Sequence, residues 1–426
     1  MRAPTPTSVM RHGMHVRRPR PLRPGAAVLL LAAAVSLGAQ ATSPAEPGPA
    51  PTAPPPTRVM GKPTNLSQQV PVGLDVSIPT SGNAGDVPGN EWVFAPVPGY
   101  NPVLGATLLV GAAKIYRPKD ASATAPAWMT GGGAFVAENK SWAVGVGHKM
   151  NLQDDRWRLS GGVVYADINY RFYGIGNDAG DQDRYVPIRQ QAPAFTAKFT
   201  GRVASSSWYL GFKLMAADST IRLNLNDLPS GVEPPPGLTI PDDAFKPFLA
   251  SVTPVVEYDS RDDDFYPRHG VLFSASMAVF SDKYGSDFNF KVYEFAYNQY
   301  FQLSERGVLA VRGYTRVANG DVPFFALSSL GQGADLRGYT AGRYRDEALF
   351  STQAEYRYEL SKRWTLVAFA GVGGVGPSLS EIPQMLPAGG GGVRFSLGKE
   401  NKLNLRLDVA WGKNDHAIYL SVGEAF

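Results

Sequence analysis

The sequence predicts an all-β fold, a transmembrane antiparallel β-barrel, and three observations support this prediction. Segments of about nine to eleven residues alternate apolar and polar side chains, which is the length of a tilted strand that crosses a bilayer. Tyr358, Trp364 and Trp411 lie near the ends of such segments, as aromatic residues do at membrane interfaces. The N-terminus carries the pattern of an export signal. A soluble sandwich also alternates, so the export signal and the dense charge on the polar faces favour the barrel.

The first 41 residues form a predicted secretory signal peptide. They contain six arginines and no acidic residue, and they include the apolar stretch Ala26–Gly38 and the small-residue cleavage site Ala39-Gln40-Ala41. The apolar stretch is too short for a membrane anchor, which needs about 20 residues. Without this segment the chain has 35 basic and 37 acidic residues. The basic character therefore belongs to the signal, and the mature chain has no electrostatic basis for binding nucleic acid.

Two short segments separate the signal from the barrel. Residues 42–57 contain seven prolines and predict an extended linker. Residues 58–93 are polar and rich in turn residues, and we expect a periplasmic tether or a plug there, not a domain. The barrel is expected over residues 94–426. The chain has no cysteine, which excludes disulfides, thiolate metal sites and a lipoprotein anchor.

Period-two alternation dominates the predicted barrel. In residues 402–412, Leu405, Leu407 and Trp411 share one face, whereas Arg406 and Asp408 share the other. Fifteen strands are counted directly, near residues 103–116, 129–138, 141–150, 156–170, 185–202, 206–223, 246–260, 269–281, 286–303, 306–317, 348–360, 363–373, 389–398, 402–412 and 416–426. Bacterial single-chain barrels usually have an even number of strands. We therefore expect sixteen strands, with the error before residue 246.

Counting strands back from Phe426 assigns the connections to the two sides of the membrane. The connections 224–245, 318–347 and 374–388 fall on the extracellular side, and they are the longest in the predicted barrel. Barrels of this class have long extracellular loops and short periplasmic turns. The assignment is therefore consistent for the C-terminal half.

Three segments resemble motifs of one family of membrane barrels. Leu336-Arg337-Gly338-Tyr339, within the connection 318–347, is similar to a signature loop tip. Residues 170–177 are similar to a second family motif. A third, strand–turn–strand motif is matched by Tyr258, Asp259, Arg261, Asp262, Pro267 and Gly270. On these matches the chain over roughly residues 94–426 is identified as a member of the BamA/TamA-type superfamily of outer-membrane assembly barrels, also called the bacterial surface antigen family.

A second copy of the signature letters occurs in Val311-Arg312-Gly313-Tyr314. This copy lies within an alternating segment in which Leu309 and Val311 face one way while Arg312 and Tyr314 face the other. We interpret it as ordinary strand sequence with arginines directed into the barrel.

The resemblance implies that the signature loop tip folds into the barrel. In the family the loop arginine contacts an aromatic and an acidic side chain on the two strands that follow, and the matching residues here are Phe369 and Glu355. The family usually has an aspartate two residues after that phenylalanine, where this chain has Gly371. We therefore expect Glu355 or Glu359 to pair with Arg337, because an unpaired buried charge is costly. The alternative is a surface arginine on a mobile loop.

The last predicted strand ends in an aromatic residue. Ile418, Leu420, Val422 and Phe426 are expected on one face, which Glu424 interrupts. The pattern resembles the C-terminal signal that the outer-membrane insertion machinery reads. We therefore expect that machinery as a partner during assembly, together with outer-membrane lipid.

The resemblance also implies a function. Active family members usually carry N-terminal periplasmic modules that receive client chains, whereas the segment before this barrel is short and rich in proline. We expect a barrel-only member in the bacterial outer membrane, related to protein insertion, translocation or envelope assembly. A separate periplasmic partner or a client protein is the expected partner. The alternative is a passive, porin-like channel with no assembly activity.

Catalytic chemistry has little support in the sequence. Ser260 and His269 lie near the acidic run Asp262-Asp263-Asp264, but all of them belong to the strand–turn–strand match. The acidic run could bind a cation through its oxygens, although a solvated turn explains it as well. We expect no enzyme activity, no cofactor and no metal site.

Overall fold

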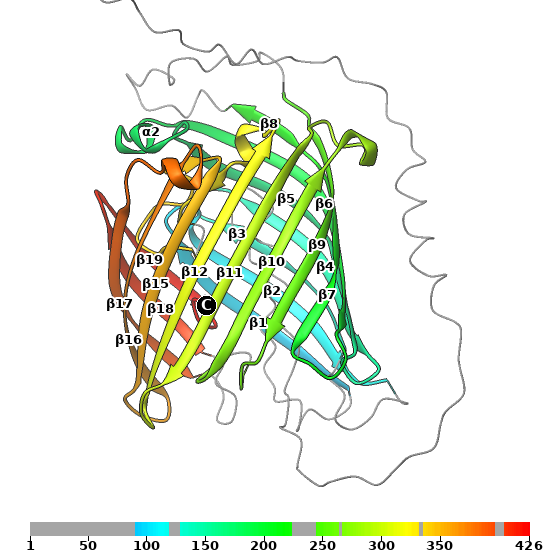
Figure 1. The fold of residues 1–426 in the computed structure, drawn as a ribbon, viewed down its shortest axis with the longest axis vertical. Coiled ribbons are helices and arrows are strands. Elements are labelled where there is room, and N and C mark those ends of the chain that lie inside the picture. The colour runs from blue at the N-terminus through cyan, green and yellow to red at the C-terminus, as the bar shows by residue number, and fades with distance from the viewer. Residues whose placement is uncertain (1–89, 119–127, 224–243, 264–265, 332–334, 397–403) are drawn as a thin grey trace, which may run out of the picture. The chain divides into compact units, whose positions relative to one another are not determined.

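The computed structural model describes residues 90–118, 128–223, 244–263, 266–331, 335–396 and 404–426. All of them belong to one compact unit, Thr57–Phe426. The predicted signal peptide, the linker and most of the predicted tether lie outside the described residues. Figure 1 shows the described part, in which tilted strands form the wall of a barrel.

Antiparallel strands follow one another around the barrel in chain order. The strands of the wall are β1 (Asn90–Asn101), β2 (Gly105–Tyr116), β3 (Trp128–Ala137), β4 (Trp142–Leu152), β5 (Trp157–Phe172), β6 (Val186–Arg202), β7 (Trp208–Asp218), β8 (Thr220–Leu223), β9 (Phe248–Asp259), β10 (Gly270–Phe280), β11 (Phe290–Gln302), β12 (Gly307–Gly320), β15 (Ala348–Glu359), β16 (Trp364–Gly376), β17 (Leu386–Ser396), β18 (Asn404–Gly412) and β19 (Asp415–Val422). Strands β7 and β8 both pair with β6 and form one wall strand that is interrupted at Ser219. The barrel closes where β1 pairs with β19. The predicted barrel of sixteen strands is confirmed.

The strand missing from the sequence count is β1. It begins at Asn90, ahead of the predicted barrel boundary at residue 94, and pairs with β2 along its whole length. Pro96, Pro98 and Gly99 obscured it, because proline and glycine are depleted in strands.

The alternation decides which side chains meet lipid. On β15, Gln353, Glu355 and Arg357 are buried inside the barrel, whereas Tyr356 and Tyr358 are exposed on the outside. Along β12, Arg312 and Tyr314 face inward, so this second copy of the signature letters is strand sequence. A closed barrel with an apolar outer face satisfies its backbone in lipid, as an open sheet would not.

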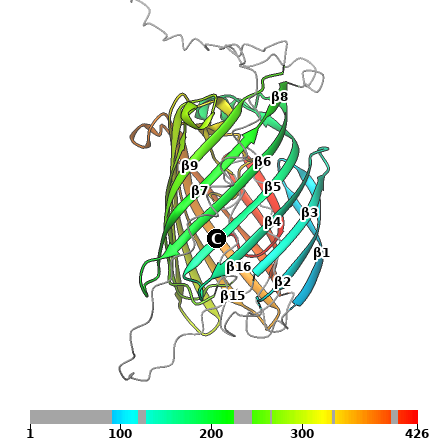
Figure 2. The same cartoon turned by 90° about the vertical axis from the view of Figure 1, so that its right-hand side faces the viewer.

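The two ends of the barrel differ in their connections. Short turns at residues 303–306 and 360–363 join strands at one end, where β1 begins and β19 ends. Longer connections, including 321–347 and 377–385, lie at the other end together with the short helix α2 (Asn177–Asp181) (Figures 1 and 2). We assign this second end to the extracellular side. Among the described residues, no helix is both long and apolar enough to cross a membrane.

An apolar cluster fills the barrel interior near the extracellular end. Phe324 and Phe325 belong to the one-turn helix η4 (Phe324–Ala326), which lies in the connection 321–347. Their rings pack on Phe172, Phe245 and Phe288, with ring centroids 5.1 to 6.5 Å apart. The first part of this connection therefore anchors it inside the wall.

Candidate functional site

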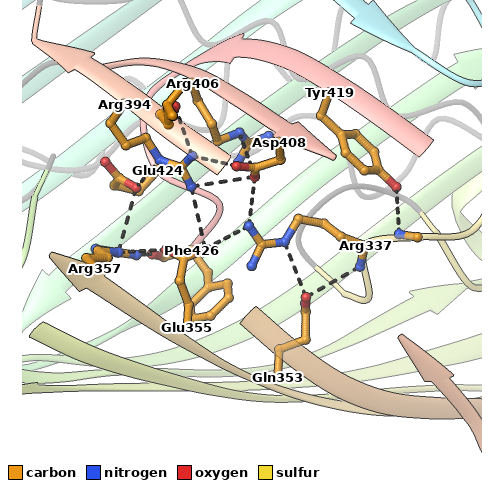
Figure 3. A network of polar contacts seen from close by, with 12 residues as sticks. Arg337, Gln353, Glu355, Arg357, Arg394, Arg406, Asp408, Tyr419, Glu424 and Phe426 are labelled. Atoms are coloured by element: carbon orange, nitrogen blue, oxygen red, sulfur yellow. Dashed lines mark hydrogen bonds and ion pairs between the residues drawn. The ribbon is translucent and has the colours of Figure 1, made fainter. Parts of the chain in front are cut away.

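The signature tip of the connection 321–347 lies inside the barrel (Figure 3). Leu336 and Tyr339 are fully buried, and Arg337 is 1% exposed. Arg337 is therefore buried, and the alternative of a surface arginine on a mobile loop was wrong. We call the tip Leu336–Tyr339 and the side chains around Arg337 the loop clamp.

Gly338 brings the tip against the backbone of the barrel wall. It has a φ of +112°, a left-handed conformation that favours glycine. A side chain there would meet the carbonyl carbon of Trp411 at 2.9 Å. The Gly338 amide donates a hydrogen bond of 3.1 Å to the hydroxyl of Tyr419. The tip is therefore held by both β18 and β19.

Arg337 makes three kinds of contact within the loop clamp. Its guanidinium forms ion pairs of 2.7 Å with Glu355 on β15 and with Asp408 on β18. It lies 3.5 Å from the centre of the Phe369 ring on β16, a cation–π distance. The side-chain amide oxygen of Gln353 accepts hydrogen bonds from the backbone amide and from the Nε of Arg337. The structure thus places Glu355 and Phe369 where the resemblance implied.

The second acid of the loop clamp was not expected on β18. A side chain at Gly371 would meet the carbonyl oxygen of Thr352 at 2.5 Å and the Cδ1 of Leu336 at 2.9 Å. An aspartate at this position has no room while Leu336 is seated there. Asp408 supplies the second carboxylate instead. The sequence showed that Asp408 lies on the polar face of its strand, but it did not show that Asp408 lies close to Arg337.

Glu359 does not belong to the loop clamp. It lies at the periplasmic end of β15 and forms a 2.9 Å ion pair with Arg268 of the β9–β10 turn. Of the two expected acids, only Glu355 reaches Arg337.

Further arginines extend the loop clamp into a network (Figure 3). Arg357 binds Glu355 at 2.7 Å, and Arg394 contacts Asp408 on the neighbouring strand. Arg394 also binds Glu424 at 2.9 Å. Buried arginines are tolerated when carboxylates satisfy them, and breaking one such pair leaves an uncompensated charge. The network therefore couples the loop tip to three strands and to the C-terminal residues.

The C-terminal residues depart from the predicted strand. Strand β19 ends at Val422, and Gly423 follows with a φ of +94°. Phe426 therefore does not continue the outer face of Ile418 and Leu420, because the left-handed residue breaks the alternation. Its carbonyl oxygen instead accepts a 2.9 Å hydrogen bond from Arg357. Recognition of this segment by the insertion machinery stays a prediction.

Glycines on β17 leave room for the loop clamp. A side chain at Gly390 would meet the Phe369 ring at 2.7 Å, and one at Gly392 would collide with the Asp408 carboxylate. Both positions face inward by the register with β16 and β18. Packing thus explains Gly390 and Gly392, since a larger residue at either position would displace side chains that hold Arg337.

Polar contacts also join three segments at the extracellular end, above the loop clamp. Lys413, in the β18–β19 turn, binds Asp181 of α2 at 2.8 Å, and Tyr344 donates a 2.9 Å hydrogen bond to the same carboxylate. Arg343 donates to the carbonyl of Gly180 at 3.0 Å. The hydrogen bond from Lys413 lowers the pKa of Asp181, and that from Tyr344 lowers it further. Burial raises the pKa of the Tyr344 hydroxyl. We call these residues the extracellular cap.

The closure of the barrel between β1 and β19 is short. Among the described residues, Tyr100 and Leu420 are the one residue pair in register between these strands. By contrast, β1 pairs with β2 along all twelve of its residues. We call the junction of β1 and β19 the seam.

Comparison with known proteins decides the family. The profile of the Omp85 superfamily domain matches residues 138–426, more than half of the chain. The chain belongs to the Omp85 superfamily. The predicted membership in the BamA/TamA-type superfamily is confirmed. No curated protein matches the chain.

Solved structures share the fold of this Omp85 barrel. BamA from Haemophilus ducreyi lacking POTRA domains 1–3 matches with a TM-score of 0.54 and 12% identity, over 78% of this chain and 70% of that chain. CdiB from Acinetobacter baumannii matches with a TM-score of 0.52 and 11% identity, over 85% and 72% of the two chains. CdiB from Escherichia coli has a TM-score of 0.50 and 9% identity, over 79% and 67%. At these identities the likeness establishes the fold, and an Omp85 barrel places the protein in the bacterial outer membrane.

The strand–turn–strand motif of this Omp85 barrel forms the periplasmic turn between β9 and β10. Asp262 accepts hydrogen bonds from the amides of Arg268 and His269 at 2.9 and 3.1 Å. Gly270 has a φ of +103° at the start of β10. Tyr258 and Asp259 end β9, and Pro267 is buried in the turn.

The same turn contains the residues considered for catalysis. The Ser260 hydroxyl accepts a 3.0 Å hydrogen bond from the Val271 amide, so it serves the turn itself. His269 lies 3.7 Å from Asp262 and is largely exposed. Asp264 lies outside the described residues. No group of three or more metal-ligating side chains occurs in the part of the chain that the structure describes.

A second periplasmic cluster was not found from the sequence. Asp155, in the β4–β5 turn, binds Arg158 at 2.6 Å and also pairs with Arg202. Tyr209 donates a 3.0 Å hydrogen bond to the same carboxylate. Burial works to raise the pKa of Asp155, but the hydrogen bond and charge of Arg158 outweigh it and keep the pKa low. The sequence carries no spacing signal that joins these residues from three strands.

Proposed function

We propose that this Omp85 barrel assists the insertion or translocation of polypeptides at the bacterial outer membrane. The observation that carries the proposal is the seam, where Tyr100 and Leu420 are the one pair in register between β1 and β19 in the described part of the chain. A barrel wall that is paired along its full length has no easy route from lumen to lipid. A wall strand that is joined to its neighbour by a short ladder can open sideways at small cost, because few backbone hydrogen bonds must break.

The loop clamp supports an assembly role over a passive channel. A porin-like channel needs a water-filled lumen, whereas the tip Leu336–Tyr339 is buried inside this barrel by contacts with four strands. The extracellular cap ties α2 to the β18–β19 turn at the same end. We expect little ion conductance while these contacts are in place.

The proposal includes export, partners and the absence of catalysis. We propose that the chain is exported through a signal peptide cleaved after Ala41 and that a separate periplasmic partner or the client itself delivers polypeptide to the barrel. Neither insertion nor translocation in this proposal requires a covalent step, so no enzyme activity is invoked.

Reconstitution with a lockable seam tests the proposal. The chain has no cysteine, so Tyr100→Cys with Leu420→Cys introduces a unique pair across the seam. The reduced variant in liposomes is expected to accelerate the folding of an unfolded client barrel, and oxidation is expected to abolish the acceleration reversibly. The single variant Leu420→Cys, treated with the same oxidant, is the matched control.

Two outcomes would contradict the proposal. One is client folding no faster than in protein-free vesicles together with steady conductance in planar bilayers, which would favour a passive channel. The other is acceleration that persists when the seam is locked, which would remove the seam from the mechanism.

A further inference from the structure

The orientation of the β1 backbone at the seam follows from its prolines. Strand β1 pairs with β2 without interruption, including Pro96 with Val110 and Pro98 with Leu108. Proline has no N–H and cannot donate to a ladder. The main-chain groups of the even-numbered residues of β1 must therefore point away from β2, toward the seam, while the odd-numbered residues bond to β2. The carbonyl of Ala106 on β2 bonds to Glu138 on the β3 side, which fits the same alternation.

Strand β19 presents its even-numbered residues to the same seam. The amide of Gly423 donates to the carbonyl of Asn404 on β18, so the odd-numbered residues of β19 face β18. Tyr100 and Leu420 therefore face each other with both N–H and C=O groups. Continued in register, the next facing positions are Pro98 with Val422 and Pro96 with Glu424. In both of these pairs the β1 residue has no donor.

Two other prolines show the effect of a missing donor in this barrel. At Pro254 the β9–β10 ladder is broken between the pairs Val255–Ser276 and Val252–Val279. At Pro193 the pairing of β6 with the strand formed by β7 and β8 is also broken. The break lies between the pair Ala194–Ala217 and the pair Gln191–Thr220. At both places the strands pair again beyond the break. At the seam they do not, because β19 ends and the chain turns inward at Gly423.

We infer that Pro96 and Pro98 prevent β1 from pairing with the C-terminal residues beyond Tyr100 and Leu420. They deny hydrogen-bond donors to the carbonyls of Val422 and Glu424, so an extended C-terminal strand would gain little by pairing with β1. The last residues instead enter the network, where Arg394 binds the Glu424 side chain at 2.9 Å and Arg357 binds the Phe426 carbonyl at 2.9 Å. The two prolines thus determine where the pairing of the seam stops. They leave the edge of the periplasmic half of β1 without a paired strand.

The inference goes beyond the proposed function, because it also limits what can dock on the open edge. A strand that aligned with β1 from the periplasm would find donors at the even positions Asn90, Trp92 and Phe94, but none at Pro96 or Pro98. Regular pairing would therefore stop partway along β1. A peptide strand in an extended conformation is the partner that this edge fits, over its first residues only.

A disulfide reporter tests the inference without any client. Ala95 and Ala425 are opposite each other if β19 continues in register past Val422, so Ala95→Cys with Ala425→Cys reports zipping in a chain that has no other cysteine. Adding Pro96→Ala and Pro98→Ala restores two donors, each of which shifts such an equilibrium about two- to tenfold. We expect the initial rate of disulfide formation in the folded, detergent-solubilised barrel to rise roughly tenfold. Pro254→Ala with the same reporter is the control and should leave the rate unchanged.

Two measurements decide the outcome. Equal disulfide rates with and without the prolines, in barrels that remain heat-modifiable on gels, would overturn the inference. If the quadruple variant does not fold, Pro98→Ala alone is examined by amide hydrogen exchange. Increased protection of a peptide covering residues 418–426 supports the inference, and unchanged protection overturns it. Because no client is present, these results are independent of whether the barrel assists polypeptide insertion.

Discussion

Arg337 and Asp408 are 71 residues apart in the sequence and form a 2.7 Å ion pair inside the barrel. The pair joins the tip of an extracellular connection to the fifteenth strand of the wall, and Glu355 completes it from β15. A loop that is tied across the barrel in this way restrains the strands next to the seam.

Replacing Arg337 with alanine is expected to destabilise the folded barrel. The change leaves Glu355 and Asp408 buried without their shared partner, which costs about 3–5 kcal/mol. Heat-modifiability on gels and the midpoint of urea unfolding in micelles measure the effect. Lys362→Ala, in an exposed periplasmic turn, is the matched control. Wild-type behaviour of the Arg337 variant would mean that the loop clamp does not stabilise the barrel.

Asp408→Asn and Glu359→Gln are expected to differ sharply. The first removes a charged hydrogen-bonding partner from a fully buried site, at a cost of about 1.5–3 kcal/mol. The second weakens a partly exposed pair with Arg268, worth about 0–1 kcal/mol. Unfolding midpoints of the two variants provide the comparison. A larger loss for Glu359→Gln would mean that the pair with Arg268 stabilises the barrel more than Asp408 does.

Gly371→Ala is expected to loosen the loop tip although it adds only a methyl group. The new carbon would meet the Cγ of Gln353 at 2.6 Å and the Cδ1 of Leu336 at 2.9 Å. Overpacking of this kind costs about 1–3 kcal/mol. Protease cleavage within residues 321–347 should become faster. Gly389→Ala, whose added carbon would lie at an ordinary 3.4 Å from its neighbour, should have no such effect.

Acidification is expected to open the extracellular cap. The hydrogen bond from Lys413 lowers the pKa of Asp181 below its usual 3.8, so the folded cap favours the carboxylate. This contribution is present above pH 3.8 and is lost as the pH falls through the lower pKa of the folded state. Conductance in planar bilayers should rise as the pH falls below this value.

Asp181→Asn is the control for the acid effect. It removes the titrating group, so its conductance should be raised already at neutral pH and should change little on acidification. A variant that kept the full pH response would assign the titration to another group.

The alternation of side chains in the sequence determined the barrel, fifteen of its sixteen strands and which face of each of these strands meets lipid. These properties are local, because a strand reverses its side chains at every residue and the bilayer sorts the two faces by polarity. Glu355 and Phe369 could be assigned to the interior for the same reason. Even the parity error was placed before residue 246, where β1 was missed.

Only the tertiary structure decided which inward side chains meet. Asp408 and Arg394 became partners of the loop clamp because neighbouring strands bring their inner faces together, and no spacing in the chain encodes that contact. The turn of the C-terminal residues into the barrel likewise depends on which hydrogen-bond donors β1 presents across the seam. The prolines of β1 are visible in the sequence. Whether their ring nitrogens point toward β2 or toward the seam is set by the pairing of β1 with β2, which exists only in the folded sheet.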